Sequence, residues 1–239
     1  MKLPSLAVSM IKALIFDFDG LILDTESPEL QAWQEIFIEH GHELKLDLWA
    51  DLVGRPRTYF DMYAHFNELN GAGLDLDQLR RRRRARVIDL VLNQPILPGI
   101  ENYLSEAKRL GLKVGLASSS GGDYVRGHLR RLSLFDYFHA TKCFEDTSAH
   151  KPEPAPYLAV LDDLGIAPRE AIAFEDSPNG ITAARAAGIF CVAVPNPITQ
   201  GLLLDHADCR VKSLADEPLQ QLLARASRTA AVTSNGKAK

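Results

Sequence analysis

The chain has 239 residues, of which 46% are hydrophobic and 24% charged, and its formal net charge is −4. This length and composition suit one large α/β domain, or a core domain with a smaller insert. The net charge offers no general attraction for nucleic acid, no apolar run is long enough for a membrane span, and the three irregularly spaced cysteines suit neither a disulfide framework nor a zinc site. In the absence of a secretory signal, we expect a cytoplasmic monomer with neither a nucleic-acid nor a membrane partner.

The first predicted strand is the apolar run at 13–16, which ends at Asp17, Asp19 and Gly20. Consecutive apolar residues favour a strand buried on both faces, as in a parallel sheet. In an extended chain both carboxylates lie on one side, and Gly20 allows a sharp turn. At an effective dielectric of about 20, two unit charges ~4 Å apart repel by about 4 kcal/mol. Two acids this close therefore indicate either a bound cation or a retained proton, although a strand-end turn with two exposed acids has the same local pattern.

An all-helical block follows the first strand. Apolar residues recur with helical spacing from Leu30 to Phe37, and two further helices are predicted around 60–66 and over 76–92. No strand is predicted between Ser27 and Pro95. The block therefore reads as an insertion, and we expect a domain boundary on each side of 26–95.

Strands and helices alternate after this block, a pattern typical of a doubly wound parallel sheet. The predicted strands cover 112–117, 140–144, 171–174 and 190–194, and a closing helix covers 214–226. The expected fold class is α/β, with a core formed by 1–25 and 96–226. The last residues, 227–239, are small and polar, so we expect a disordered tail.

Polar residues follow the predicted strands at each carboxyl end. Ser118 follows the second strand, Lys151 lies in the loop after the third, and Glu175 and Asp176 follow the fourth. In a parallel sheet these ends meet Asp17 and Asp19 at one edge. The carboxylates suit Mg²⁺. The Ser118 hydroxyl, Lys151 and a helix N-terminus near Gly121 suit phosphate oxygens.

Four segments in this order resemble the motifs of the haloacid-dehalogenase superfamily, and more narrowly its β-phosphoglucomutase-like branch. They are DFDG at 17–20, LASSS at 116–120, HKPEP at 150–154 and FEDSPNG at 174–180. The resemblance extends over about 11–223. It implies a Rossmann-like core with a helical cap domain inserted after the first motif.

The resemblance also implies roles for individual residues. Asp17 would be the nucleophile that takes the phosphoryl group, and Asp19 the general acid and then the general base. Ser118 and Lys151 would hold the phosphoryl oxygens. Mg²⁺ would be bound by Asp17, the backbone carbonyl of Asp19, Asp176 and, directly or through water, Glu175. These roles agree with the charge neutralisation and positioning that phosphoryl transfer requires.

A further set of residues is expected to bind the substrate. It comprises Gly20, Glu29, Ser119, Gly121, Arg55 and Arg57. The two arginines lie in a loop of the implied cap that would contact the distal part of the substrate, where a planar guanidinium suits an anion. A surface turn around Pro56 explains them equally well. The arginine run at 80–84 reads as a solvated helix face paired with acids, although one arginine could lean over the site.

Two departures from the mutase pattern favour hydrolysis. Glu29 stands where the mutase has a histidine, and Gly121–Gly122 replaces a lysine–asparagine pair. Losing polar contacts to a sugar suits an enzyme that only needs to admit water. We therefore predict a Mg²⁺-dependent phosphatase that hydrolyses a small phosphorylated metabolite, a sugar or polyol phosphate, through an aspartyl-phosphate, with a phosphomutase as the alternative.

Three other functions fit the sequence less well. A dehalogenase needs one aspartate and no metal, whereas this chain also has Asp19 and the acids at 175–176. A phosphonate hydrolase needs a cap lysine, and Lys45 is the only lysine between Ser27 and Pro95. The complete set of catalytic residues argues against a non-catalytic binding module.

Overall fold

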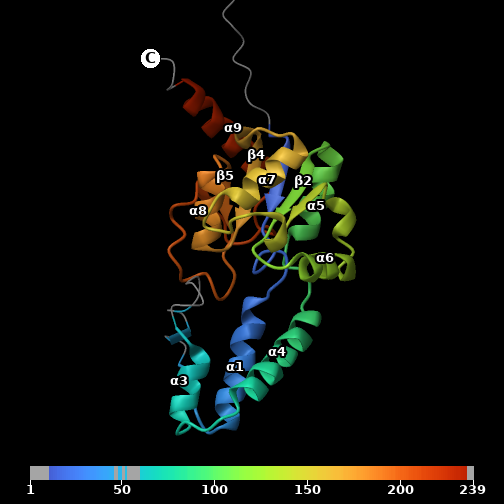
Figure 1. The fold of residues 1–239 in the computed structure, drawn as a ribbon. Coiled ribbons are helices and arrows are strands. Elements are labelled where there is room, and N and C mark those ends of the chain that lie inside the picture. Colours follow the sequence, from blue (N-terminus) through green and yellow to red (C-terminus); the bar gives the residue numbers. More distant parts are fainter. Residues whose placement is uncertain (1–10, 46–47, 50–51, 53–59, 236–239) are drawn as a thin grey trace, which may run out of the picture.

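The computed structural model describes residues 11–45, 48–49, 52 and 60–235, and its core is a parallel six-stranded sheet (Figure 1). The strand order is β3-β2-β1-β4-β5-β6. The strands are β1 Ala13–Phe16, β2 Lys113–Ala117, β3 Ala140–Lys142, β4 Ala171–Glu175, β5 Phe190–Ala193 and β6 Cys209–Arg210. The first predicted strand is confirmed and lies in the middle of the sheet, entirely buried. β6 has no counterpart among the predicted strands, because two residues give no apolar run.

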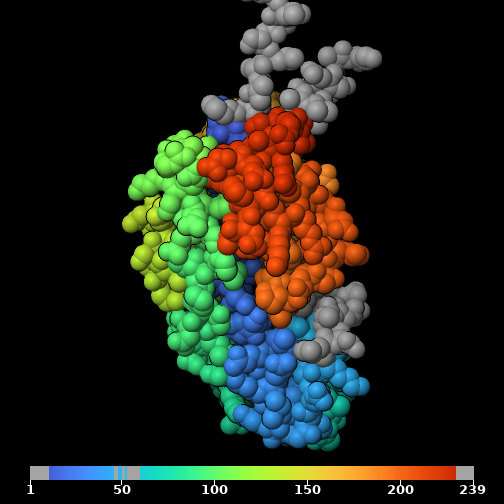
Figure 2. All heavy atoms as spheres, turned by 180° about the vertical axis from the view of Figure 1, so that it is seen from behind, coloured from blue at the N-terminus to red at the C-terminus, as the bar shows by residue number. Residues whose placement is uncertain are grey.

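Helices cover both faces of the sheet, because alternate residues of a strand point to opposite faces. In β1, Leu14 and Phe16 belong to one hydrophobic cluster, whereas Ala13 and Ile15 belong to another. The first face is covered by α5 Ile100–Leu110, α6 Gly122–Arg131 and α9 Leu219–Asn235, and the second by α7 Ala155–Leu164 and α8 Pro178–Ala186. Figure 2 shows α5 in green beside the C-terminal residues in orange and red. The doubly wound core predicted from the sequence is confirmed.

Three more helices, α1 Glu26–Glu39, α3 Met62–Leu69 and α4 Leu76–Leu92, lie together below the core in Figure 1. We call them the helical group. They share a separate hydrophobic cluster in which Trp33, Phe37 and Phe66 are buried. The chain enters the group after β1 and leaves it before α5. These two linkers pair, since the Leu97 N–H donates to the Ile22 carbonyl at 3.0 Å. The three helices predicted within 26–95 are confirmed.

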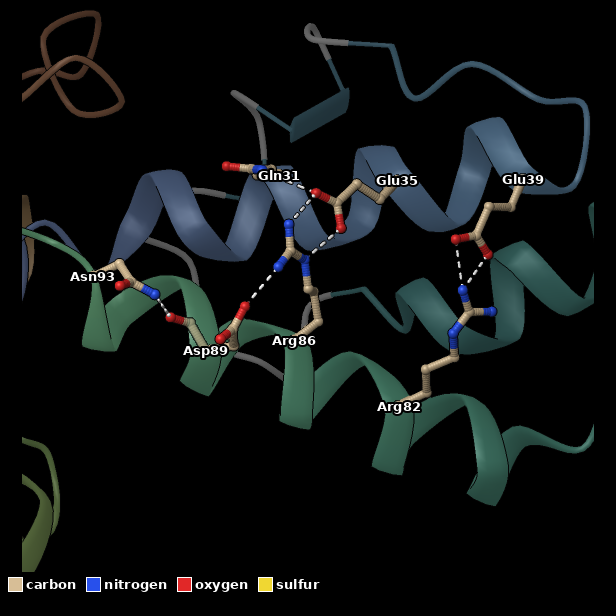
Figure 3. A network of polar contacts seen from close by, with 7 residues as sticks. All are labelled: Gln31, Glu35, Glu39, Arg82, Arg86, Asp89 and Asn93. Carbon is tan, nitrogen blue, oxygen red and sulfur yellow. Dashed lines mark hydrogen bonds and ion pairs between the residues drawn. The ribbon is translucent and has the colours of Figure 1, made fainter.

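The arginine run at 80–84 lies on α4 and pairs with acids of α1 (Figure 3). Arg82 forms an ion pair with Glu39. One helical turn further on, Arg86 contacts both carboxylate oxygens of Glu35 at 2.7 and 2.8 Å. Exposed pairs of this kind are screened by solvent and stabilise a protein only weakly. The predicted solvated face with acidic partners is therefore confirmed for the exposed members of the run, although Arg83 is largely buried, and the pairs connect α4 to α1.

The C-terminal segment differs from the prediction. We expect a helix over 214–226 and a disordered tail from 227, but α9 spans Leu219–Asn235. The expectation of disorder is wrong for 227–235, and 236–239 lie outside the described residues. The segment is small and polar, yet it contains several alanines, which have the highest helix propensity. Neither α9 nor another helix of the described residues is long and apolar enough to cross a membrane.

Candidate active site

The carboxyl ends of the central strands form the candidate site. The Asp17 N–H donates to the Phe174 carbonyl at 3.1 Å, so the chain stays beside β4 for one residue beyond β1. β4 ends at Glu175, and Asp176 follows it. Ser118 follows β2 and is buried. The structure thus brings the polar residues that follow three predicted strands to one edge of the sheet, as expected for parallel neighbours.

Lys151 connects the ends of β1 and β4. Its Nζ lies 2.5 Å from Asp17 Oδ1 and 2.6 Å from Glu175 Oε1, and all three side chains are largely buried. Burial alone would lower the pKa of Lys151, but the charges of Asp17 and Glu175 outweigh this and raise it above its usual value. The lysine is therefore a permanent cation, located where it can also meet the oxygens of a phosphoryl group.

Asp17, Glu175 and Asp176 form a compact acidic cluster. Each offers a carboxylate oxygen, and these oxygens lie within 4.8 Å of one another. Burial, and then the charge of Asp17, raise the pKa values of Glu175 and Asp176. Three buried carboxylates have only Lys151 as a charged partner among these contacts, so negative charge is in excess. This donor set fits a hard divalent cation such as Mg²⁺, which oxygen ligands bind.

Gly20 makes the approach of Asp176 to the first loop possible. Its φ of +76° is in the left-handed region, which glycine adopts without strain. A Cβ on Gly20 would lie 2.3 Å from Asp176 Oδ2. The contact explains a glycine at this position sterically, and the predicted role of Gly20 in substrate binding stays a prediction.

Asp19 faces the loop that follows β2. Ser120 Oγ donates to Asp19 Oδ2 at 2.6 Å, and Ser118 Oγ lies 3.4 Å from the same oxygen. Burial, and then the charge of Asp17, raise the pKa of Asp19 to about 6, against the hydrogen bonds from Ser120 and Thr25 that lower it. A carboxyl group with this pKa can hold a proton near neutral pH and release it, as a general acid must.

Two carboxylates from one loop thus have different surroundings, one paired with a lysine and the other able to hold a proton.

The family model of haloacid dehalogenase-like hydrolases matches residues 14–194. The chain belongs to this family. YhcW of Bacillus subtilis is 45% identical over 90% of this chain and 97% of its own length. The fructose-1-phosphate phosphatase YqaB of Escherichia coli is 34% identical over 76% of this chain and 95% of its own.

A solved structure agrees with these relatives. The crystal structure of β-phosphoglucomutase from Clostridium difficile has a TM-score of 0.69 and 26% identity, and the match covers 92% of this chain and 99% of that one. The chain described here is a haloacid dehalogenase-like hydrolase of the β-phosphoglucomutase-like branch.

In this hydrolase the N-terminus of α6 directly follows the loop 118–120, where we expect donors for phosphate oxygens. Gly121 is the N-cap residue, and Ser119 is exposed just before it. The next backbone donor, the Gly122 N–H, is already bonded to Glu145 Oε2 at 2.9 Å. Contacts of Ser119 and Gly121 with substrate stay predictions.

Glu29 lies in the first turn of α1 and is held by α4. Arg83 forms an ion pair with Glu29, and its Nε donates to Tyr63 Oη at 2.6 Å. Arg83 is thus a member of the arginine run that points inward. A role of Glu29 in substrate binding stays a prediction. Two other residues predicted to bind substrate, Arg55 and Arg57, lie outside the described residues.

The sequence reasoning missed three residues that hold the acids of the candidate site. Ser120 donates to Asp19, Tyr157 Oη donates to Glu175 Oε1, and Asn196 Nδ2 donates to Asp176 Oδ2. A signal exists for Asn196, which follows β5 in a Pro-Asn-Pro turn and so obeys the same strand-end rule. Ser120 lies inside a recognised motif without standing out among its three serines. Tyr157 is spaced like any core residue of its helix.

Proposed function

We propose that this enzyme hydrolyses a small phosphorylated metabolite, a sugar or polyol phosphate, in a Mg²⁺-dependent reaction through an aspartyl-phosphate. The observation that carries the proposal is the contrast between Asp17 and Asp19. Asp17 lies 2.5 Å from the Lys151 cation, whereas Asp19 has a pKa of about 6 and accepts a hydroxyl hydrogen bond. One carboxylate is suited to nucleophilic attack and the other to proton transfer.

The first step transfers the phosphoryl group to the protein. An Asp17 carboxylate oxygen bonds to phosphorus, the bond from phosphorus to the ester oxygen breaks, and the departing alkoxide takes the proton of Asp19. In the second step Asp19, now ionised, takes a proton from water. The water oxygen bonds to phosphorus, the bond to Asp17 breaks, and inorganic phosphate leaves. Lys151 offers positive charge to the phosphoryl oxygens in both steps.

The side chains of Asp17, Glu175 and Asp176 and the backbone carbonyl of Asp19 would hold Mg²⁺. When bound, the ion neutralises the negative charge of the transferring group. The protein's own part is to fix the ligands, through Tyr157 for Glu175 and through Asn196 for Asp176. Chelator should therefore silence hydrolysis, Mg²⁺ should restore it, and Asp176→Ala should weaken metal affinity more than Glu175→Ala. Full activity in chelator would contradict the metal dependence.

We further propose that the helical group, within residues 26–95, is a cap that closes over the strand ends. Tyr124 of α6 supports this arrangement. Burial, and then the charges of Asp19 and Glu29, raise the pKa of Tyr124, because a carboxylate of the core and one of the helical group both disfavour the ionised phenol. Glu29 of the helical group thus lies near the catalytic side of the core. A small substrate enclosed between them would be protected from bulk water.

The test of function is the release of phosphate from a panel of sugar, polyol and nucleoside monophosphates with Mg²⁺. We expect turnover on at least one sugar or polyol phosphate and its loss in Asp17→Asn. Asp162→Asn is the matched control, since Asp162 is an exposed acid on α7. The nucleophile assignment would be wrong if Asp17→Asn kept even about a tenth of the wild-type kcat, since losing a nucleophile removes orders of magnitude.

The product distinguishes a phosphatase, which releases inorganic phosphate, from a phosphomutase, which returns the phosphoryl group to the sugar. β-Glucose 1-phosphate, supplied with a trace of the bisphosphate, is followed by phosphorus NMR. We expect inorganic phosphate as the main product. Formation of glucose 6-phosphate faster than phosphate release would identify a mutase instead.

A further inference from the structure

The first turn of α6 lies directly after Ser120, a residue that contacts Asp19. Asp19, which gives its proton to the leaving oxygen in the proposed function, accepts a hydrogen bond from Ser120 at 2.6 Å. Gly121 and Gly122 follow directly and begin α6. The atoms attached to the leaving oxygen therefore emerge beside Ser120 and the N-terminus of this helix.

A helix N-terminus with free N–H groups attracts anions. In this chain a carboxylate of the protein already occupies the position. Glu145 Oε2 accepts the Gly122 N–H at 2.9 Å, and Oε1 lies 3.2 Å from the point that a Cβ on Gly121 would occupy. The hydrogen bond from the Gly122 backbone lowers the pKa of Glu145, so the group is charged at neutral pH.

The loop that carries Glu145 is fixed from both sides. The short 3₁₀ turn Phe144–Asp146 is bound to the loop 118–120, because the Phe144 N–H donates to the Ser120 carbonyl at 3.0 Å. The Cys143 N–H donates to Asp146 Oδ2 at 2.8 Å. On the helix side, Arg126 lies 3.7 Å from the same Asp146 oxygen.

Arg126 also closes the space beside Gly122. A Cβ on Gly122 would lie 2.0 Å from an Arg126 guanidinium nitrogen. The glycine thus allows the arginine to lie against the backbone of the first turn. The position of the Glu145 carboxylate therefore results from a set of mutual contacts between α6 and the loop after β3.

We propose that Glu145 occupies the anion-binding position of α6 and thereby selects phosphomonoesters whose organic part is uncharged near the leaving oxygen. A hydroxyl group can donate to the Glu145 carboxylate. A second phosphate or a carboxylate would meet a like charge, and the Gly122 donor that it needs is already bonded. The inference rests on the proposed function and names the substrate class within it.

The experiment compares kcat/KM for fructose 1-phosphate and fructose 1,6-bisphosphate, counting phosphate released from either position. The variants are Glu145→Gln, which keeps size and an acceptor, and Glu145→Ala, which also frees the Gly122 donor. Asp123→Asn is the matched control, because Asp123 is an exposed acid in the same first turn. This control removes one negative charge near the start of α6 and leaves Glu145 unchanged.

We expect the wild type to prefer the monophosphate by about tenfold or more, as for one charge-assisted contact. Glu145→Gln should shift the ratio toward the bisphosphate by about tenfold, and Glu145→Ala by at least as much. Asp123→Asn should change it by less than about twofold, since the Gly122 N–H is bonded to Glu145 and stays bonded in this variant. The ratio is an internal reference, so a partly unfolded variant does not change it.

The inference would be overturned by a wild type that cleaves both substrates equally well, or by an unchanged ratio in both Glu145 variants. An equal shift in Asp123→Asn would also overturn it, because it would show that any negative charge near the start of α6 has the same effect. Failure of the proposed function looks different. In that case the wild type releases phosphate from no sugar or polyol monophosphate before a variant is made.

Discussion

Asn196 Nδ2 lies 2.8 Å from Asp176 Oδ2 and 3.1 Å from the carbonyl oxygen of Gly20, so one buried amide joins the loops that follow β1, β4 and β5. The amide is itself fixed, because the Thr199 N–H donates to Asn196 Oδ1 at 2.9 Å. The orientation of Asp176 is thus set by a residue outside all four recognised motifs. A ligand carboxylate held in this way keeps one oxygen engaged and the other available to a cation.

Replacing Asn196 should weaken metal binding without removing a ligand. Asn196→Ala leaves Asp176 free to rotate, and outer-shell partners of this kind typically change metal affinity by about 10- to 100-fold. The measurement is the Mg²⁺ concentration at half-maximal activity. Asn93→Ala is the control, since the Asn93 amide donates to the Asp89 carbonyl at the exposed end of α4 (Figure 3). An unchanged Mg²⁺ requirement in Asn196→Ala would contradict the positioning role.

Gly20→Ala should damage both stability and metal binding. A non-glycine residue at φ +76° costs roughly 1–3 kcal/mol of unfolding free energy, and its Cβ would also displace the Asp176 carboxylate. Gly71 provides a matched control, because it has the same φ of +76° and a Cβ added there would meet nothing within 4 Å. Denaturant unfolding should show a loss for both variants, but only Gly20→Ala should raise the Mg²⁺ requirement. Equal effects on metal affinity would contradict the close approach.

The acids at the strand ends could be predicted because the signal is local. An apolar run that stops at Asp17, or at Glu175 and Asp176, gives both the strand and its functional end. Parallel pairing then brings these ends together without knowledge of side-chain packing. The same argument predicts the helical insertion, since apolar spacing changes from strand to helix between Thr25 and Pro95.

The contacts that tune the site could not be predicted in this way. Tyr157 lies on the buried face of α7, where its spacing indicates core packing, and only the packing of α7 on the sheet brings its hydroxyl to Glu175. Which serine of 118–120 reaches Asp19 depends on the turn before α6. The Glu145 contact joins the first residue of α6 to a residue 23 positions later in the chain, and the sequence gives no signal at the Glu145 end.

Asp19→Asn should distinguish leaving groups. The general acid matters when the departing oxygen needs a proton, and hardly when the leaving group is stable as an anion. We therefore expect Asp19→Asn to reduce cleavage of an alkyl phosphate by about 10²- to 10⁴-fold, the usual contribution of general acid catalysis, and cleavage of p-nitrophenyl phosphate far less. Steady-state kcat/KM values for the two substrates provide the test. Equal losses would count against the acid role.

Ser120→Ala should move the pH profile of the same reaction in a direction that follows from the hydrogen bond. Burial and the charge of Asp17 raise the pKa of Asp19 to about 6, and the Ser120 hydroxyl opposes this by stabilising the ionised form. Below this pKa Asp19 is protonated and can act as the acid, so kcat/KM for an alkyl phosphate should fall as the pH rises through it. Without Ser120 the ionised form loses a donor, the pKa of Asp19 rises, and the descending limb should move to higher pH.

The limb for p-nitrophenyl phosphate should stay in place, because its leaving group needs no proton. Ser105→Ala, an exposed serine of α5, is the control. A limb that moves to lower pH in Ser120→Ala, or that moves equally for both substrates, would show that the hydroxyl acts on another group.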